Sequence, residues 1–86
     1  SMYPSREEAV KVYKAIPENG INLDRLYISL TDKSINYCKF RFAIEAFREL
    51  GLVKMNASDF GVSRVKVSAK TDLYSAPVLE KLRSRL

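Results

Sequence analysis

The spacing of the apolar residues changes at Gly51, and this change limits the folds open to the chain more than any other feature. Over residues 31–50 the apolar side chains recur at helical intervals, and after Gly51 the spacing shifts toward the alternation of a strand. Glycine takes the left-handed backbone conformation that closes many helices without a steric cost. The sequence therefore predicts a long helix that ends at Gly51 and a chain reversal that packs a β-hairpin beside it.

The hairpin is predicted from two short runs with strand-like alternation, LVKMN and VSRVKVS, which flank the five-residue loop ASDFG. On the second run Val65 and Val67 face one side of the ribbon, while Arg64 and Lys66 face the other. The loop between the runs is expected to form the tip of a wing.

Two shorter helices are predicted before the long one. Ser5 and Glu8 have the spacing of a capping box, so a helix over about residues 6–16 should begin there and end at the following proline. Asn22 is the predicted N-cap of a second, short helix, and Ile21 is expected to add one small strand before it.

The long helix has three candidate caps, which are Thr31, Asp32 and Ser34. Its apolar arc is predicted to face the core and contains Ile35, Phe42, Ala43, Ala46, Phe47 and Leu50, with Phe40 and Ile44 at the edge. A last helix is predicted over residues 75–86. The predicted core consists of Val10, Tyr13, Leu26, Leu30, Phe42, Ala46, Phe47, Leu50, Val53, Val65 and Val67.

This order of elements predicts an α+β, winged-helix fold with three helices, a two-stranded β-hairpin wing and a C-terminal helix. The chain has 86 residues, enough for one domain and too few for two, so residues 1–86 are expected to form a single domain. Ser1-Met2 resembles the remnant of an expression tag, and the chain is therefore expected to be a piece of a longer protein.

The positive charge is concentrated in the second part of the chain. Residues 33–86 hold eleven Lys or Arg and five Asp or Glu, a net charge of +6, whereas residues 1–32 have a net charge of −1. This asymmetry indicates a polyanionic or acidic partner, although a lysine-rich surface without a partner explains it equally well.

The single cysteine, Cys38, suits a reducing compartment, and no apolar run is long enough for a membrane span. A cytoplasmic location without membrane contact is therefore expected.

The residue types that most catalytic sites need are missing from the sequence. It has no histidine, one cysteine and no glycine-rich phosphate loop. Glu45 and Glu49 have a spacing that could suit a metal, but Arg41 and Arg48 interleave them, which favours a solvated charge ladder. The sequence therefore predicts that this chain is not an enzyme by itself and holds neither a metal nor a cofactor.

The β-ribbon is the first candidate for binding nucleic acid. Lys54, Arg64 and Lys66 can project from one side of it, where basic side chains bind backbone phosphates without reading sequence. The alternative is that these charges prevent an edge strand from pairing with other chains.

The face of the long helix opposite the core is the second candidate. It carries Ser34, Tyr37, Cys38 and Arg41. In a winged helix such a face enters the major groove, where arginine reads guanine and hydroxyl groups hold phosphates. Glu45 and Glu49 on or beside this face are unfavourable opposite phosphates, so the stronger alternative is a face that is merely solvated.

Three stretches together resemble a known protein family. YPSREEAVKVYKAI, FAIEAFRELGLV and KTDLYSAPVLEKL are similar, in that order and at similar separations, to the C-terminal extension of RecJ-type single-stranded-DNA-specific exonucleases from Gram-positive bacteria. The likeness covers most of the chain. The opening P-S-R-E-E and the closing D-L-x-S-A-P distinguish this family from other winged helices, because F-x-E-L-G-L-V occurs in many of them.

The resemblance implies a parent enzyme that degrades single-stranded DNA from the 5′ end in repair and recombination. Such an enzyme holds magnesium or manganese with aspartates and histidines of its own motifs, none of which this chain contains. The extension is then an accessory module. Its partner is expected to be single-stranded DNA, bound weakly, or a protein, which is either the parent catalytic core or the acidic tail of a single-strand-binding protein. Two alternatives stay open: a protein-interaction winged helix that receives an acidic peptide, and a dimeric, free-standing transcription regulator that starts at Met2.

Overall fold

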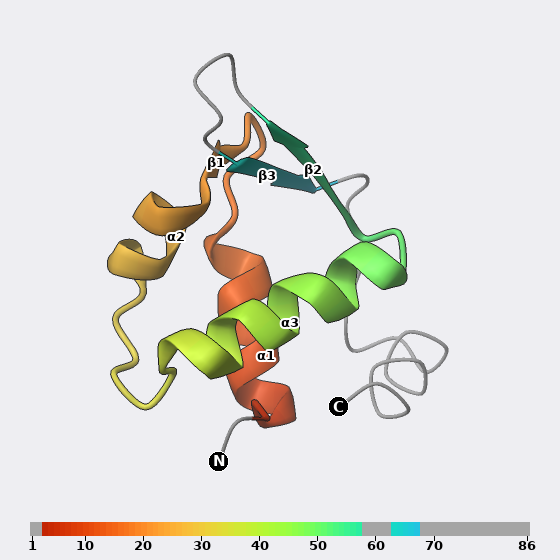
Figure 1. The fold of residues 1–86 in the computed structure, drawn as a ribbon. Helices are drawn as coiled ribbons and strands as arrows, with labels where there is room; N and C mark the ends of the chain where they lie inside the picture. Colours follow the sequence, from red (N-terminus) through yellow and green to blue (C-terminus); the bar gives the residue numbers. More distant parts are fainter. Residues whose placement is uncertain (1–2, 58–62, 68–86) are drawn as a thin grey trace.

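In the computed structural model, which describes residues 3–57 and 63–67, the chain has an α+β fold with three helices on one side of a small antiparallel sheet (Figure 1). The elements are α1 (Arg6–Ala15), β1 (Ile21–Asn22), α2 (Leu23–Ser29), α3 (Tyr37–Glu49), β2 (Val53–Ala57) and β3 (Ser63–Val67). This layout is compatible with a winged helix. Most of the predicted wing tip and the whole predicted C-terminal helix, 75–86, lie outside the described residues.

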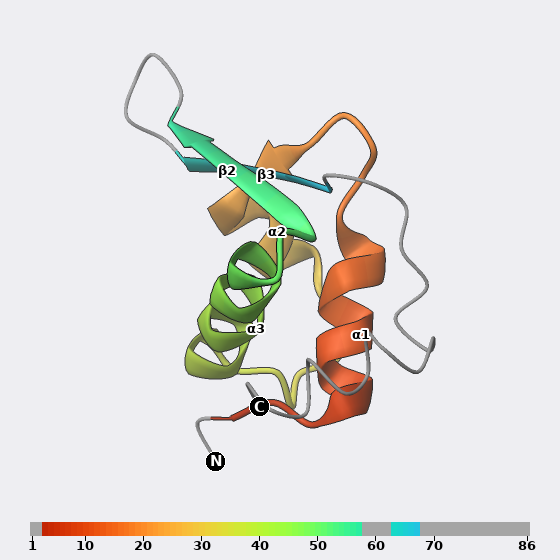
Figure 2. The same ribbon diagram turned by 90° about the vertical axis from the view of Figure 1, so that its right-hand side faces the viewer.

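The sheet has the strand order β1-β3-β2, and both pairings are antiparallel. Ile21 lies opposite Val65, which confirms the small strand predicted before the second helix. Val53 and Val65 are buried, with 2% and 0% of their surface exposed, so this face of the ribbon packs on the helices. Because side chains alternate along a strand, Lys54, Asn56 and Lys66 point away from the helices, and all three are exposed. Figure 2 shows the sheet lying across the ends of the helices, with none of the described elements on its outer face.

The first two helices begin where the sequence predicts. Ser5 and Glu8 form a capping box at α1, because each side chain accepts a hydrogen bond from the other residue's backbone N–H, at 3.1 and 2.8 Å. The side chain of Asn22 accepts a hydrogen bond from the backbone N–H of Arg25 at 3.1 Å and caps α2.

The start of α3 differs from the prediction, because none of the three candidate caps is used. The helix begins at Tyr37, and the side chain of Asn36 accepts the capping hydrogen bond from the backbone N–H of Lys39 at 2.9 Å. The carboxylate of Asp32 instead accepts a hydrogen bond from the backbone N–H of Ser34, two residues on, and fixes a turn before the helix. The helix therefore starts after this turn and not within it.

The end of α3 confirms the predicted role of Gly51, whose φ angle is +74°. The backbone N–H of Gly51 donates to the carbonyl of Arg48 at 3.0 Å, and the N–H of Leu52 donates to the carbonyl of Phe47 at 2.8 Å. These two bonds define a Schellman motif. Strand β2 begins at Val53, directly after this reversal.

The core contains eight of the predicted residues: Val10, Tyr13, Leu26, Leu30, Ala46, Phe47, Val53 and Val65. The prediction for Phe42 is wrong, because it is only half-buried, whereas Leu50 is partly buried and packs against this core. The side chain of Val67 lies outside the described part of the chain. The fully buried aromatic residues of α3 are Phe40 and Phe47. The buried residues of α3 are Phe40, Ala43, Ile44, Ala46 and Phe47, so the buried face is rotated by roughly 60° from the predicted arc.

Candidate nucleic-acid interface

The outward face of the β-ribbon carries two of the predicted basic residues, Lys54 and Lys66, and both are exposed. They are direct partners in the register of β2 and β3. In such a cross-strand pair the Cβ atoms are about 4.5–5.5 Å apart, and like charges at this position disfavour the pairing of the two strands. Within residues 3–57 and 63–67 no carboxylate forms an ion pair with either lysine. Among the described residues, the pair is therefore a local excess of positive charge that a bound anion would relieve.

The third predicted residue of the ribbon is Arg64, which lies on β3 two residues before Lys66; its side chain lies outside the described part of the structure. Its register partners are Asn56 on β2 and Asn22 on β1. Neither partner is acidic, so the sheet offers no opposite charge at this position. That Arg64 extends the lysine pair into a basic track stays a prediction.

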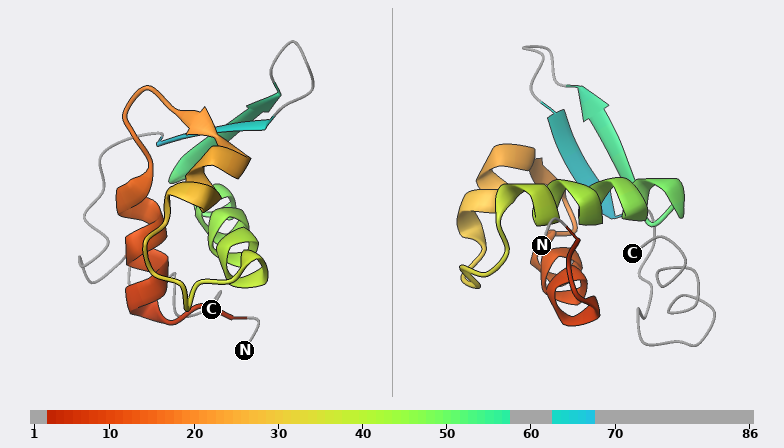
Figure 3. Two further views of the ribbon diagram at one scale, coloured as in Figure 1. Left: turned by 90° about the vertical axis from the view of Figure 1, so that its left-hand side faces the viewer. Right: turned by 60° about the horizontal axis from the view of Figure 1, so that its bottom comes forward.

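Gly20 borders this basic face, and the sequence did not predict this position for it. Its φ angle is +82°, and a Cβ atom added there would lie 3.1 Å from the carbonyl oxygen of Val65 and 3.4 Å from the Cβ of Lys66. The turn between α1 and β1 therefore passes close beside the base of Lys66. The left view of Figure 3 shows the backbone of this turn running past one end of β3. The sequence marks Gly20 only as a turn residue, and no local pattern reveals which strand the turn approaches.

The outer face of α3 differs from the ribbon. Tyr37 is exposed at 43%, but its ring packs against Tyr27 at 5.1 Å between centroids and against Phe40 at 5.9 Å. Cys38 is exposed. Ser34 does not lie on this helix, contrary to the prediction, because it belongs to the turn before Asn36.

The arginines on this outer face already contact a carboxylate. Arg41 Nη2 lies 3.3 Å from Glu45 Oε1, while Arg48 Nε and Nη2 lie 3.1 and 2.6 Å from Glu45 Oε2. Each oxygen of Glu45 is thus taken by one guanidinium. The charge ladder predicted from the spacing is confirmed for these three residues, so α3 offers less available positive charge than the ribbon does.

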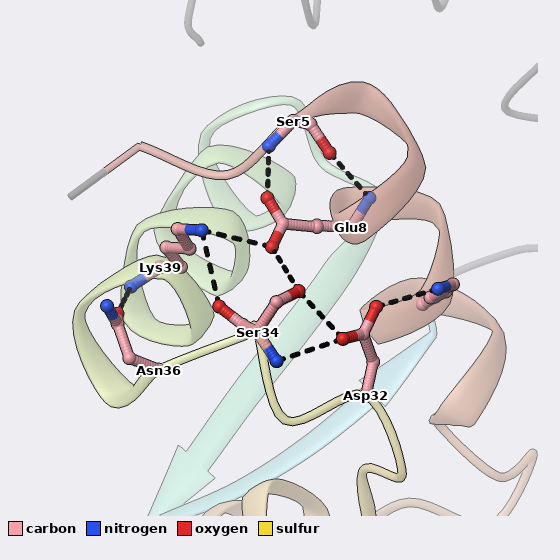
Figure 4. Close-up of polar contacts among 7 residues, drawn as sticks. Ser5, Glu8, Asp32, Ser34, Asn36 and Lys39 are labelled. Carbon is pink, nitrogen blue, oxygen red and sulfur yellow. Dashed lines mark hydrogen bonds and ion pairs between the residues drawn. The ribbon is translucent and has the colours of Figure 1, made fainter. Parts of the chain in front are cut away.

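A second polar cluster joins α1, the turn before α3 and the start of α3 (Figure 4). Glu8 Oε2 lies 3.1 Å from Lys39 Nζ and 2.9 Å from Ser34 Oγ. Ser34 Oγ also lies 2.7 Å from Asp32, whose carboxylate accepts a hydrogen bond from Lys11 Nζ at 2.7 Å. The sequence indicates only the capping role of Glu8, because the other partners of this carboxylate are more than twenty residues away.

The charges of this cluster are internally balanced. The backbone N–H of Ser5 lowers the pKa of Glu8 most, partial burial opposes this, and Lys39 and Ser34 add to the lowering, so that the pKa falls from 4.5 to about 2. Hydrogen bonds from Lys11 and Ser34 hold the pKa of Asp32 well below its usual range, while Asp32 raises the pKa of Lys11. The cluster therefore stabilises the contact between α1 and α3 and offers no vacant charge to a ligand.

Neither a metal cluster nor a spanning helix occurs in the described part of the chain. Within residues 3–57 and 63–67, no three His, Cys, Asp or Glu side chains gather as a metal site would require. In the same residues no helix has the length and apolar character needed to cross a bilayer. The expected absence of a metal and of catalysis stays a prediction.

Comparison with known proteins adds no relative, because no family model, curated protein or solved structure matches the chain. The resemblance to the exonuclease extension therefore rests on the three sequence stretches alone. The geometry that bears on function is the exposed Lys54–Lys66 pair on the ribbon and the paired arginines on α3.

Proposed function

We propose that the chain is a non-catalytic nucleic-acid-binding module and that the outward face of β2 and β3 contacts the phosphates of a single strand. The observation that carries this proposal is the direct opposition of Lys54 and Lys66. Two like charges in this position destabilise a sheet, so their presence without a nearby carboxylate in the described residues favours an anionic partner. Phosphates fit this role because lysine binds them as a point charge without a fixed geometry.

The sequence resemblance supplies the context of the proposal. The module would be the accessory C-terminal domain of a cytoplasmic 5′–3′ single-stranded-DNA exonuclease in DNA repair and recombination. Metal chemistry with magnesium or manganese would belong to the catalytic core of that parent protein. A weak grip by this module would then be useful, because two linked modules on one strand bind far more tightly than either does alone.

The proposal is tested by titrating a fluorescent single-stranded oligonucleotide at about 50 mM salt, where phosphate contacts are strong, with the parent chain and with the variant Lys54→Gln/Lys66→Gln. The double variant should bind much more weakly, since it loses both free ammonium groups. Arg25→Gln/Lys33→Gln is the matched control, because it removes the same charge from α2 and the turn before α3. If the two double variants bind alike, the ribbon is not the contact surface.

A second candidate function is the capture of an acidic peptide, such as the tail of a single-strand-binding protein. Glu45 on the outer face of α3 favours it, because a carboxylate there disfavours nucleic acid while the lysine pair accepts carboxylates as readily as phosphates. Amide chemical shifts of Lys54 and Lys66 should then move with a Glu-rich peptide and stay constant with single-stranded DNA. The reverse result supports the nucleic-acid module.

A further inference from the structure

We infer that Glu45 excludes duplex nucleic acid from α3 and thereby confines binding to the ribbon. The inference rests on the proposed function, because it concerns which form of nucleic acid the module accepts. Its basis is the position of one carboxylate between the two arginines of the outer face of α3, Arg41 and Arg48. In a winged-helix layout this is the face that a duplex would have to take into its major groove.

The geometry places Glu45 at the centre of this face. It lies four residues after Arg41 and three residues before Arg48, so the three side chains share one side of the helix. Its side chain is 39% exposed, which leaves the carboxylate facing any molecule that approaches the two guanidinium groups. A phosphate that contacts either arginine would therefore also lie close to the carboxylate.

The outer face of α3 and the β-ribbon differ in the charge that they present to a phosphate. Exposed pairs of this kind are individually weak, so Glu45 acts through its charge and not by locking the arginines in place. On α3 an incoming phosphate meets this fixed negative charge, whereas the Lys54–Lys66 pair has no carboxylate partner in the described part of the chain. In a winged-helix layout a single strand can follow the ribbon alone, whereas a duplex that takes α3 into its major groove also brings its phosphates against this helix.

The alternative is that Glu45 only stabilises the helix through its two ion pairs. A merely structural role would change the unfolding temperature and weaken binding to both forms of nucleic acid together. The inferred role changes the ratio of duplex affinity to single-strand affinity. Glu45→Gln distinguishes the two, because it removes the charge and keeps the length and helix propensity of the side chain.

The test measures binding of one fluorescent sequence, single-stranded and as a blunt duplex, to the parent chain and to Glu45→Gln. Duplex affinity should rise and single-strand affinity should change much less. Once the negative charge beside them is gone, the two arginines can each contact a phosphate, so the gain on duplex should fall about tenfold between roughly 50 and 200 mM salt. Adding Arg41→Gln and Arg48→Gln to Glu45→Gln should remove the gain, while Glu7→Gln on α1 changes net charge equally and should give none.

The outcomes separate this inference from the proposed function. If the parent chain binds single strands through Lys54 and Lys66 but Glu45→Gln leaves duplex affinity unchanged, the role of Glu45 is wrong and the proposed function stands. A gain of the same size in Glu7→Gln, or one that survives loss of both arginines, also overturns it. If neither the parent chain nor Glu45→Gln binds either form, both proposals are wrong.

Discussion

Gly51 contributes a backbone conformation and nothing else to the fold. Its φ angle of +74° lies in the left-handed region, and a Cβ atom added there would meet no other atom within 4 Å. The position therefore excludes other residues through backbone strain alone and not through lack of space. This is why the sequence could reveal it: the conformational need of a helix end is local and does not depend on the rest of the fold.

Gly51→Val is expected to lower the free energy of unfolding by roughly 1–2 kcal/mol, since a β-branched residue is strained in the left-handed conformation. Denaturant unfolding followed by circular dichroism measures the loss. Gly51→Asn is the matched control and should lose clearly less, because asparagine tolerates this conformation. Equal stabilities of the valine and asparagine variants would show that the left-handed joint is not what the glycine supplies.

Phe47 and Phe42 are close in sequence but differ in burial. Phe47 is fully buried and packs against Tyr13, whereas Phe42 is half-buried and its ring meets the exposed ring of Tyr3 at 4.7 Å. Phe47→Ala should lower the free energy of unfolding by about 3–5 kcal/mol, the usual range for removing an aromatic side chain from a core. Phe42→Ala should cost less, and thermal unfolding of the two variants checks the order. The reverse order would contradict the orientation of α3.

Helix α3 shows what the sequence could and could not determine at the scale of an element. Its existence and its end follow from apolar spacing and one glycine, both of which are local signals. Its start and rotation do not, because Asp32 is engaged in a turn and Phe42 is covered by Tyr3, which lies near the start of the chain. Two neighbouring arcs of the helix are apolar, and only tertiary contacts decide between them.

The polar cluster around Glu8 should make the free energy of unfolding depend on pH in the acidic range. The pKa of Glu8 is about 2 in the folded chain against an ordinary value of 4.5, so the unfolded chain binds more protons between these two values. The stabilising contribution of Glu8 is therefore complete above about pH 4.5 and is lost as the pH falls toward 2. Asp32, whose pKa is also lowered, acts in the same direction.

This pH dependence is measured by urea unfolding from neutral pH down to about pH 2, the folded-state pKa of Glu8. Glu8→Gln should be less stable at neutral pH and should show a shallower loss of stability below pH 4.5 than the parent chain. Glu7→Gln is the control, because it removes a neighbouring carboxylate that takes no part in these hydrogen bonds. Parallel curves for Glu8→Gln and the parent chain would contradict the role of the cluster.

The sequence predicts which basic residues lie on the candidate site, because they alternate with apolar residues along a strand. Lys54 and Lys66 follow from the strand pattern, but their direct opposition depends on the register, which the sequence did not determine. The approach of Gly20 to Lys66 and the sharing of Glu45 by two arginines depend on tertiary placement and on rotamers. These features could be described only from the structure.

At the scale of the whole molecule, the charges of the ribbon predict weak binding that depends on salt. If Lys54, Arg64 and Lys66 each contact one phosphate of a single strand, log affinity should fall with log salt with a slope of about −2. Replacing all three by Glu should abolish binding and leave the fold intact, because the strand pattern directs these residues away from the core. Oligonucleotide titrations over a range of salt, with circular dichroism as the check on folding, measure both. Equal affinity of the triple variant and the parent chain would exclude the ribbon.

The strand order β1-β3-β2 also sets an order of events during synthesis. The central strand of the sheet, β3, is the last of the described elements to leave the ribosome, and both other strands pair only with it. Until residues 63–67 emerge, Ile21 and Val53 lack the neighbour that completes their sheet, although the three helices are already made. A nascent chain stopped before residue 63 would therefore expose the apolar surface that Val65 covers, whereas a few further residues would let the whole sheet form at once.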